Sequence, residues 1–194
     1  DNIIHVDTTI DPVRDKETID IELQLKDLES LDKKLDKVKK TARTGNKDAQ
    51  REQEVLEKVK KGLEAAISVR AIALTEKERE EFVTPIKFIT DKPVLYVCNV
   101  DENSAVNGNE YVNAVKEAVK NENAEVIILA VGTEADITEL ESFEERQLFL
   151  EDLGLHEPGA SVLIRAAYKL LKQQTYFTAG VKEVRAWTIN IGDS

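Results

Sequence analysis

A short apolar run between turn-forming residues most limits the folds open to this chain. Residues 93–102 read Pro-Val-Leu-Tyr-Val-Cys-Asn-Val-Asp-Glu, so a proline opens the run and polar residues end it. This length, with Val and Tyr inside and turn formers outside, predicts a strand buried on both faces of a sheet. Ligands of an open parallel sheet bind just beyond the carboxyl ends of its strands, which makes Asn99 and Glu102 candidate binding residues.

A second apolar run indicates that the sheet is parallel. Residues 125–131, Glu-Val-Ile-Ile-Leu-Ala-Val, are predicted to be a strand, and residues 110–121 before it have the spacing of a helix. A strand, a helix and a strand within about 40 residues predict a right-handed βαβ unit with parallel strands. Both strands then end at the same edge, so we expect Asn99 to lie near Gly132.

The amino-terminal part of the chain is typical of two long amphipathic helices. Residues 15–44 and 48–71 are predicted to be helical, with a break at residues 44–46 and with Asp48 as the second N-cap. Apolar residues recur in steps typical of a heptad seam, so we expect an antiparallel coiled-coil hairpin that projects from the body. The predicted seam residues are Ile21, Leu25, Leu28, Leu35, Val38 and Ala42 in the first helix and Leu56, Val59, Leu63, Ala66 and Arg70 in the second.

Positive charge gathers near the tip of this predicted hairpin, although the chain as a whole is acidic. The sequence has 38 acidic and 27 basic residues and a net charge of −11, so most of its surface repels nucleic acid. The charged faces of the helices are most simply a solvated surface. The tip is the one place where an anionic partner such as RNA could dock, and docking of a ribosome or RNA there is the expected binding role. The clustered cations are Lys37, Lys39, Lys40, Arg43, Lys47 and Arg51.

Local signals predict the remaining elements. Thr75 followed by Glu78 matches a capping box, which indicates a helix over residues 75–90. Residues 130–133 are interpreted as a loop between a strand and a helix, residues 136–153 as an acidic helix and residues 157–172 as another helix. Residues 176–191 are predicted to be a strand or a hairpin around Gly180.

The composition and motifs indicate the cellular compartment and limit the reactions that this chain could catalyse. The single cysteine excludes an intramolecular disulfide and suits a reducing compartment. No apolar run approaches the roughly 20 residues of a membrane span, and no signal peptide is present, so a cytoplasmic protein without a membrane partner is expected. The 194 residues also contain no Gly-x-x-x-x-Gly-Lys-Ser/Thr phosphate loop.

The residues after the first strand resemble one family. GTPases of the P-loop superclass usually carry Asn-Lys-x-Asp at this place, whereas this chain has Asn-Val-Asp-Glu at residues 99–102. That string is similar to the Asn-x-x-Glu base-recognition motif of the Obg-like ATPases, the YchF family. Residues 1–12 and 133–140 are also similar to segments of that family. The most specific similarity is that of residues 174–188, Gln-Thr-Tyr-Phe-Thr-Ala-Gly-Val-Lys-Glu-Val-Arg-Ala-Trp-Thr, to the start of its TGS domain.

This resemblance implies an α/β fold, in which part of a P-loop NTPase parallel sheet carries an inserted coiled-coil hairpin and the start of a TGS domain follows. The implied segments are residues 1–14 as the end of the first nucleotide-domain half and 15–72 as the helical insert. Residues 73–172 are then the second half of the nucleotide-binding domain, and 173–194 the start of TGS. The implied base contacts come from Asn99, Val100 and Glu102 and from the loop residues Ala130, Val131 and Gly132.

The resemblance further implies that the full-length protein binds and hydrolyses ATP, and GTP less well, with Mg²⁺, and associates with ribosomes. Glu102 is one methylene longer than the usual Asp and should not occupy the same place against guanine. Losing a well-made hydrogen bond to a charged group costs about 1.5–3 kcal/mol, enough to reverse a base preference. Because the phosphate loop is missing from these 194 residues, this chain alone is expected to be inactive and to contribute no catalytic or metal-binding residue.

Two other interpretations remain open. The second interpretation is a non-catalytic docking module that binds a ribosome, RNA or a protein through the hairpin, without specificity for DNA. An unrelated structural α/β protein with a helical hairpin is the third interpretation, and the similarity over residues 174–188 argues against it.

Overall fold

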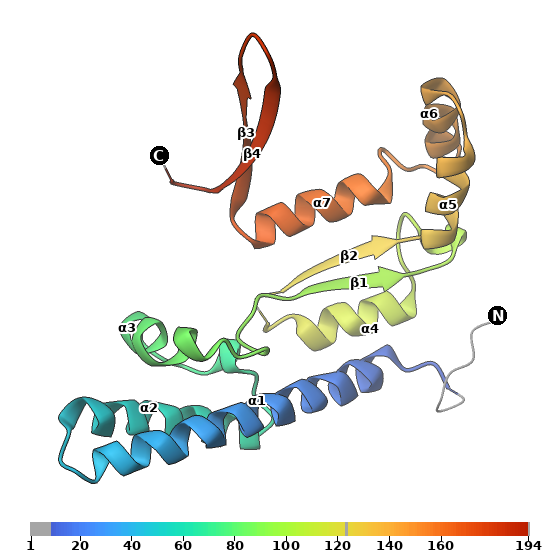
Figure 1. Ribbon diagram of the computed structural model, residues 1–194. Coiled ribbons are helices and arrows are strands. Elements are labelled where there is room, and N and C mark those ends of the chain that lie inside the picture. The colour runs from blue at the N-terminus through green and yellow to red at the C-terminus, as the bar shows by residue number, and fades with distance from the viewer. Residues whose placement is uncertain (1–8, 123, 194) are drawn as a thin grey trace. The chain divides into compact units, whose positions relative to one another are not determined.

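The computed structural model describes residues 9–122 and 124–193, which form two compact units, Asp1–Lys92 and Pro93–Ser194 (Figure 1). Residues 73–92 thus belong to the same unit as the long helices. The four functional segments predicted from the sequence remain a prediction. The family similarity at residues 1–12 lies largely outside the described residues, since the first eight are not described.

Two capped helices dominate the first unit. Helix α1 (Pro12–Ala42) begins at Asp11, whose side chain accepts a hydrogen bond from the Arg14 backbone N–H at 3.0 Å, with a proline in the first turn. Helix α2 (Lys47–Glu64) begins at Asn46, whose side chain accepts from the Ala49 N–H at 3.0 Å, so the prediction of Asp48 as N-cap is wrong. It ends at Glu64, seven residues before the predicted end at Ala71.

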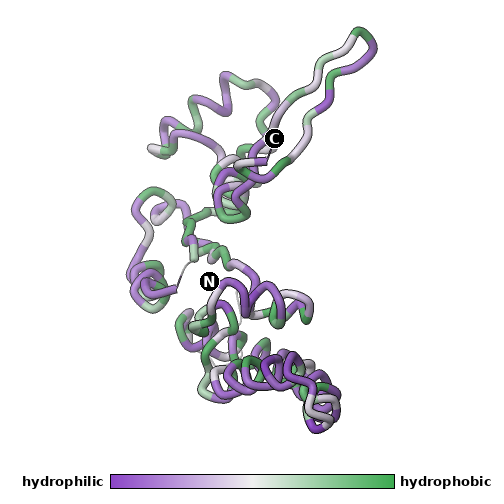
Figure 2. The backbone as a smooth tube through the Cα atoms, turned by 90° about the vertical axis from the view of Figure 1, so that its left-hand side faces the viewer, coloured by the Kyte–Doolittle hydropathy of each residue, from purple (hydrophilic) through white to green (hydrophobic). Residues whose placement is uncertain are grey.

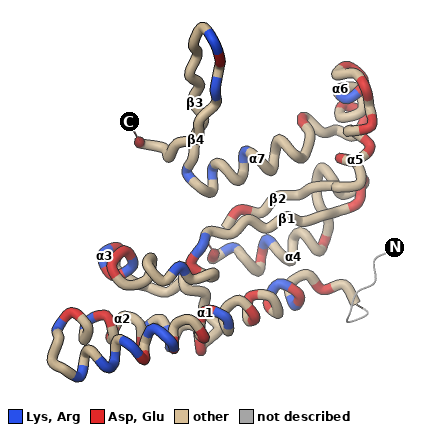
Figure 3. Tube along the Cα trace, viewed as in Figure 1, with Lys and Arg blue, Asp and Glu red and all other residues tan. Residues whose placement is uncertain are grey.

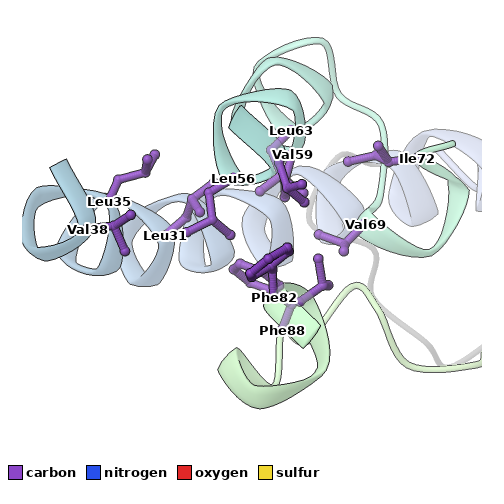
Figure 4. Packing of buried hydrophobic residues seen from close by; sticks show 12 residues of the cluster. Leu31, Leu35, Val38, Leu56, Val59, Leu63, Val69, Ile72, Phe82 and Phe88 are labelled. Carbon is purple, nitrogen blue, oxygen red and sulfur yellow. The ribbon is translucent and has the colours of Figure 1, made fainter. Parts of the chain in front are cut away.

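The facing sides of α1 and α2 form the core of this unit. The two helices pack side by side, and residues after α2 close over the same cluster (Figure 4). Leu31, Leu56 and Val59 are fully buried. Removal of their apolar side chains from water stabilises the fold. The buried cluster consists of Leu31, Leu35, Val38, Val55, Leu56, Val59, Leu63, Val69, Ile72, Phe82, Val83 and Phe88.

Part of the predicted seam is wrong. Ile21 is 50% exposed and Leu25 is 60% exposed, whereas Gln24 and Leu31 are buried. Leu25 lies off the contact side of α1, and Ile21 precedes the stretch of α1 that α2 can cover, because α2 is much the shorter helix. At the end of the paired stretch, Gln24 Nε2 donates to the backbone oxygen of Ala66 at 3.3 Å. In the second helix Ala66 and Arg70, both predicted to be seam residues, lie beyond the end of α2.

The segment after α2 consists of short helical turns, η1 (Val69–Ala71), α3 (Glu76–Glu78), η2 (Arg79–Val83) and η3 (Thr84–Ile86). The capping box of Thr75 and Glu78 is confirmed, with both of its reciprocal hydrogen bonds present. The helical turns end at Ile86, not at residue 90, because Lys87 adopts a left-handed conformation with φ 60° that stops the helix.

A buried carboxylate fastens the end of this segment to α1. Asp27, only 2% exposed, accepts hydrogen bonds from the backbone N–H of Ile89 at 2.8 Å and of Thr90 at 2.7 Å. The Thr90 hydroxyl also donates to Asp27, at 2.7 Å, and accepts from the Val69 N–H at 3.1 Å. Asp27 therefore replaces the water that these buried N–H and O–H groups lose on folding.

The second unit contains a βαβ arrangement, as predicted. Strands β1 (Leu95–Asn99) and β2 (Glu125–Leu129) pair in parallel, and helix α4 (Glu110–Val119) connects them. The prediction that β1 is buried on both faces is wrong for the described residues, since Val97 is 45% exposed. In the described part of the chain β1 pairs with β2 alone, so one edge of β1 and part of its surface stay open.

Three helices and a hairpin follow β2. Helix α5 (Val131–Glu139) and helix α6 (Phe143–Asp152) replace the single acidic helix predicted over residues 136–153, since Ser142 caps a new helix with its own capping box. Helix α7 (Gly159–Leu170) packs on β2 and leads into the antiparallel strands β3 (Gln173–Ala179) and β4 (Val184–Asn190), the hairpin predicted around Gly180. Along this hairpin hydrophilic and hydrophobic residues are interspersed (Figure 2).

Among the described helices, none is both long enough and apolar enough to span a membrane.

The role of Asp27 in the first unit can be tested by mutation. Asp27→Ala would leave the Thr90 N–H and hydroxyl without their acceptor, so we expect it to lower the free energy of unfolding by about 1.5–3 kcal/mol. Asp32→Ala is the matched control, because Asp32 makes only a surface ion pair with Lys60 and its loss should cost less than about 1 kcal/mol. Denaturant unfolding of both variants measures the difference, and equal losses would contradict the anchoring role of Asp27.

Candidate functional site

The carboxyl ends of β1 and β2 bring the predicted base-binding residues together. Asn99 lies opposite Leu129 in the strand register. Its side-chain Oδ1 accepts a hydrogen bond from the Val131 backbone N–H at 3.1 Å, and the Val100 N–H donates to the Leu129 oxygen at 2.9 Å. The predicted proximity of Asn99 to the 130–132 segment is therefore confirmed, and Asn99 is the side chain that joins the two strand ends.

Glu102 is the first residue of a tight turn that follows β1. Asp101 accepts from the Ser104 backbone N–H at 2.9 Å and so caps the 3-10 turn η4 (Glu102–Ser104). Glu102 is exposed, and its carboxylate has no hydrogen-bond or ionic partner among residues 9–122 and 124–193. Asp101 thus serves its own turn, whereas the carboxylate of Glu102 is available to a ligand.

The segment predicted to be a loop is the start of α5. This helix begins at Val131, and Ala130 before it is buried and offers no side-chain cap. Asn99 takes the place of that cap by accepting from the Val131 N–H. The remaining N–H groups of the first turn point out of the helix end, where the helix dipole is positive.

Gly132 leaves this helix end accessible. A Cβ atom at Gly132 would meet no described heavy atom within 4 Å, so open space lies beside its backbone. The next residue, Thr133, is buried at 4% exposure. A planar ligand could therefore approach the backbone at Gly132 without displacing side chains.

One side chain that the sequence did not point to, that of Glu134, adjoins this segment. Glu134 accepts hydrogen bonds from the backbone N–H of Gly159 at 2.6 Å and of Ala160 at 3.3 Å. These contacts join α5 to the start of α7 across 25 residues of sequence. No local pattern reports such a pairing, because it depends on how two helices pack.

The groups at this edge of the sheet are suited to recognising a ligand by hydrogen bonds. An amide, a carboxylate and helix-terminal N–H groups can each make hydrogen bonds to a heterocyclic base. Burial raises the pKa of the Cys98 thiol inside β1, so that group stays protonated and adds no charge beside Asn99. Within the described ranges no three His, Cys, Asp or Glu side chains are grouped so that they could hold a metal ion.

The turn between α1 and α2 is a second candidate surface. Of the six predicted cations, Lys39 pairs with Glu57 at 3.5 Å, and Arg51 lies over the Phe82 ring at 5.9 Å. Acidic and basic residues are interspersed along both helices (Figure 3). Four of the six cations make neither an ion pair nor a ring contact with the residues that the structure describes, and all four are exposed. They are Lys37, Lys40, Arg43 and Lys47.

Comparisons with known proteins show which proteins this chain is similar to. No family model matches the chain. The Ribosome-binding ATPase YchF of Bacillus subtilis (strain 168) is 45% identical over 194 residues, which are 99% of this chain and 52% of that protein. The protein of the same name from Escherichia coli O157:H7 is 46% identical over 192 residues, and the Obg-like ATPase 1 of Caenorhabditis elegans is 34% identical over 195 residues.

A comparison with solved structures finds the same family name. The structure of the Schizosaccharomyces pombe YchF GTPase matches with a TM-score of 0.85 and 30% sequence identity, over 99% of this chain and 52% of that one. The chain spans about half the length of the curated relatives it matches. The sequence identity and the shared fold together assign these 194 residues to the YchF family of Obg-like ATPases.

Proposed function

We propose that these residues form the base-recognition part of the nucleotide site in a ribosome-associated ATPase. The observation that carries this proposal is the hydrogen bond from the Val131 N–H to Asn99 Oδ1, which joins the ends of two parallel strands at 3.1 Å. Ligands of parallel α/β sheets bind at that edge. The names of the relatives, ribosome-binding ATPase and Obg-like ATPase, supply the activity and the partner that we propose for the full-length protein.

The proposed contacts follow from the hydrogen-bonding capacity of each group. Asn99 uses its oxygen on Val131, which leaves its amide N–H groups for an acceptor on the purine ring. Glu102 can accept from a ring amine, and the backbone at Val100 and from Ala130 to Gly132 frames the base. Because main-chain carbonyls accept from the adenine amine, and Glu102 does not reproduce the geometry of Asp against guanine, ATP is favoured over GTP.

The proposal assigns binding, not hydrolysis, to these residues. Phosphoryl transfer requires a phosphate loop, and these 194 residues contain no such motif. The described residues also offer no carboxylate cluster that fits Mg²⁺, so no step is assigned to the metal here. In the full-length protein, the phosphates and Mg²⁺ would be held by other residues.

In this proposal the chain also contains a helical insert and the start of a TGS domain. The paired helices α1 and α2 support a coiled-coil insert over residues 15–72. The hairpin of β3 and β4 supports the start of a TGS domain at residues 173–194, since its faces expose Phe177 and Trp187 to further packing partners. A ribosome-associated protein of this kind would work in the cytoplasm.

The base preference can be tested in the full-length protein by exchanging the motif. Glu102→Asp combined with Val100→Lys restores the guanine-type pattern, in which Asp accepts from two guanine N–H groups and the lysine stem packs along the base. We expect the ratio of GTP to ATP affinity to rise at least about tenfold, equivalent to roughly 1.4 kcal/mol. Competition binding measures this ratio.

Two controls accompany this experiment. Glu110→Asp makes the same change at an exposed position of α4 and should leave the ratio unaltered. Asn99→Ala should weaken both nucleotides, because it removes the contact to Val131 as well as one to the base. An unchanged ratio in the double variant would show that base choice does not depend on the side chain at position 102.

A second candidate function is docking without chemistry, and the four exposed cations at the tip of the hairpin favour it. RNA binding through such a patch releases counterions and weakens as salt rises. The two roles are compatible, since the tip and the strand edge use different residues. Titration of ATP and of ribosomes separately against the full-length protein distinguishes them.

The tip can be tested by removing charge at matched sites. Lys40→Gln with Arg43→Gln should weaken ribosome binding. The slope of log binding constant against log salt concentration should become less steep by roughly 0.7–0.9 for each phosphate contact that is lost. Lys26→Gln with Lys33→Gln removes the same charge from cations that already pair with Glu29, so it should have little effect. Co-sedimentation at several salt concentrations measures both, and equal effects of the two double variants would exclude a specific role of the tip.

A further inference from the structure

Glu134, which is not among the proposed base contacts, makes a second contact from the first turn of α5. Glu134, in the first turn of α5, accepts from the Gly159 N–H at 2.6 Å through Oε1 and from the Ala160 N–H at 3.3 Å through Oε2. Helix α7 has Pro158 at its N-cap, and no side chain of that residue can satisfy these N–H groups. The carboxylate from α5 therefore caps α7 and complements the positive end of its dipole.

The packing at this contact requires a glycine. A Cβ atom at the buried residue Gly159 would lie 2.6 Å from Leu129 Cδ2 and 2.9 Å from Glu134 Oε1. Glycine thus allows the start of α7 to contact both the last residue of β2 and the side chain that caps it. Helix α7 contacts β2 and α5 (Figure 1).

The segment that contains Gly132 lies between two anchors. Asn99 holds Val131 from the end of β1, and Glu134, three residues further on in the same first turn, joins α5 to α7. The backbone of Gly132 between them faces open space. Fixing both ends of so short a stretch removes its conformational freedom before a ligand arrives, which favours binding.

We propose that Glu134 is a positioning residue for base recognition. By capping α7, it fixes the backbone from Ala130 to Gly132 at the place that Asn99 sets, so that the end of α5 meets the base without rearrangement. This inference rests on the proposed function, because it assumes that Asn99 and Gly132 face a nucleotide base.

The test is ATP binding by the full-length protein, measured by competition together with the thermal unfolding temperature. Glu134→Ala removes both acceptors, and we expect about tenfold weaker binding. Glu134→Gln keeps one carbonyl acceptor, and we expect a loss of only about threefold. Glu139→Ala, which removes an exposed carboxylate from the same helix, is the control and should bind ATP as the wild type does.

A double-mutant cycle separates positioning from general stability. If Asn99 and Glu134 hold the same segment, the double variant with Asn99→Ala and Glu134→Ala should lose at least about threefold less affinity than the product of the single losses. A structural role alone would lower the unfolding temperature of both Glu134 variants without changing the affinity of the folded protein. Should Glu134→Ala fail to fold, Glu134→Gln and its double with Asn99→Ala complete the same cycle.

The outcomes distinguish this inference from the proposed function. Wild-type affinity in the Glu134 variants, together with weakened binding in Asn99→Ala, would overturn the positioning role and leave the base site standing. Strictly additive losses would overturn it as well. Wild-type affinity in Asn99→Ala would overturn the proposed site itself and, with it, this inference.

Discussion

Parallel pairing of β1 with β2, from Leu95 opposite Glu125 to Asn99 opposite Leu129, decides where the proposed site lies. Because parallel strands end at one edge, the turn after β1 and the first turn of α5 meet there. Asn99 joins the end of β1 to the start of α5 by accepting a hydrogen bond from the Val131 N–H. Everything proposed about base binding depends on that edge, since Glu102, Gly132 and Glu134 are placed by elements that begin at it.

The helical unit depends on a different constraint, the burial of a carboxylate. Asp27 satisfies the N–H groups of Ile89 and Thr90, and these residues immediately precede the segment that enters β1. Arg79 pairs with Asp91 beside them and also donates to the Ile72 oxygen at 3.2 Å. The end of the helical unit is thus fixed by polar contacts as well as by the apolar cluster between α1 and α2.

Local signals in the sequence predicted the elements better than the contacts between them. The βαβ unit followed from apolar runs and turn residues, and the meeting of Asn99 with residues 130–132 followed from parallel geometry. The start of α5 was missed because Ala130, Val131 and Gly132 carry no capping signal, and the cap comes from Asn99, 32 residues away. Ile21 was assigned to the seam because periodicity does not report where the partner helix ends.

Amide hydrogen exchange in the full-length protein, with and without ATP, tests the central claim most directly. We expect ATP to slow exchange of the amides of Gly132 and Thr133 and of the turn at residues 100–104, while the amides at the hairpin tip, residues 43–47, stay unchanged. A protein that binds ATP, as competition binding verifies, yet shows no slowing at either strand end would contradict the assignment of this edge to base recognition.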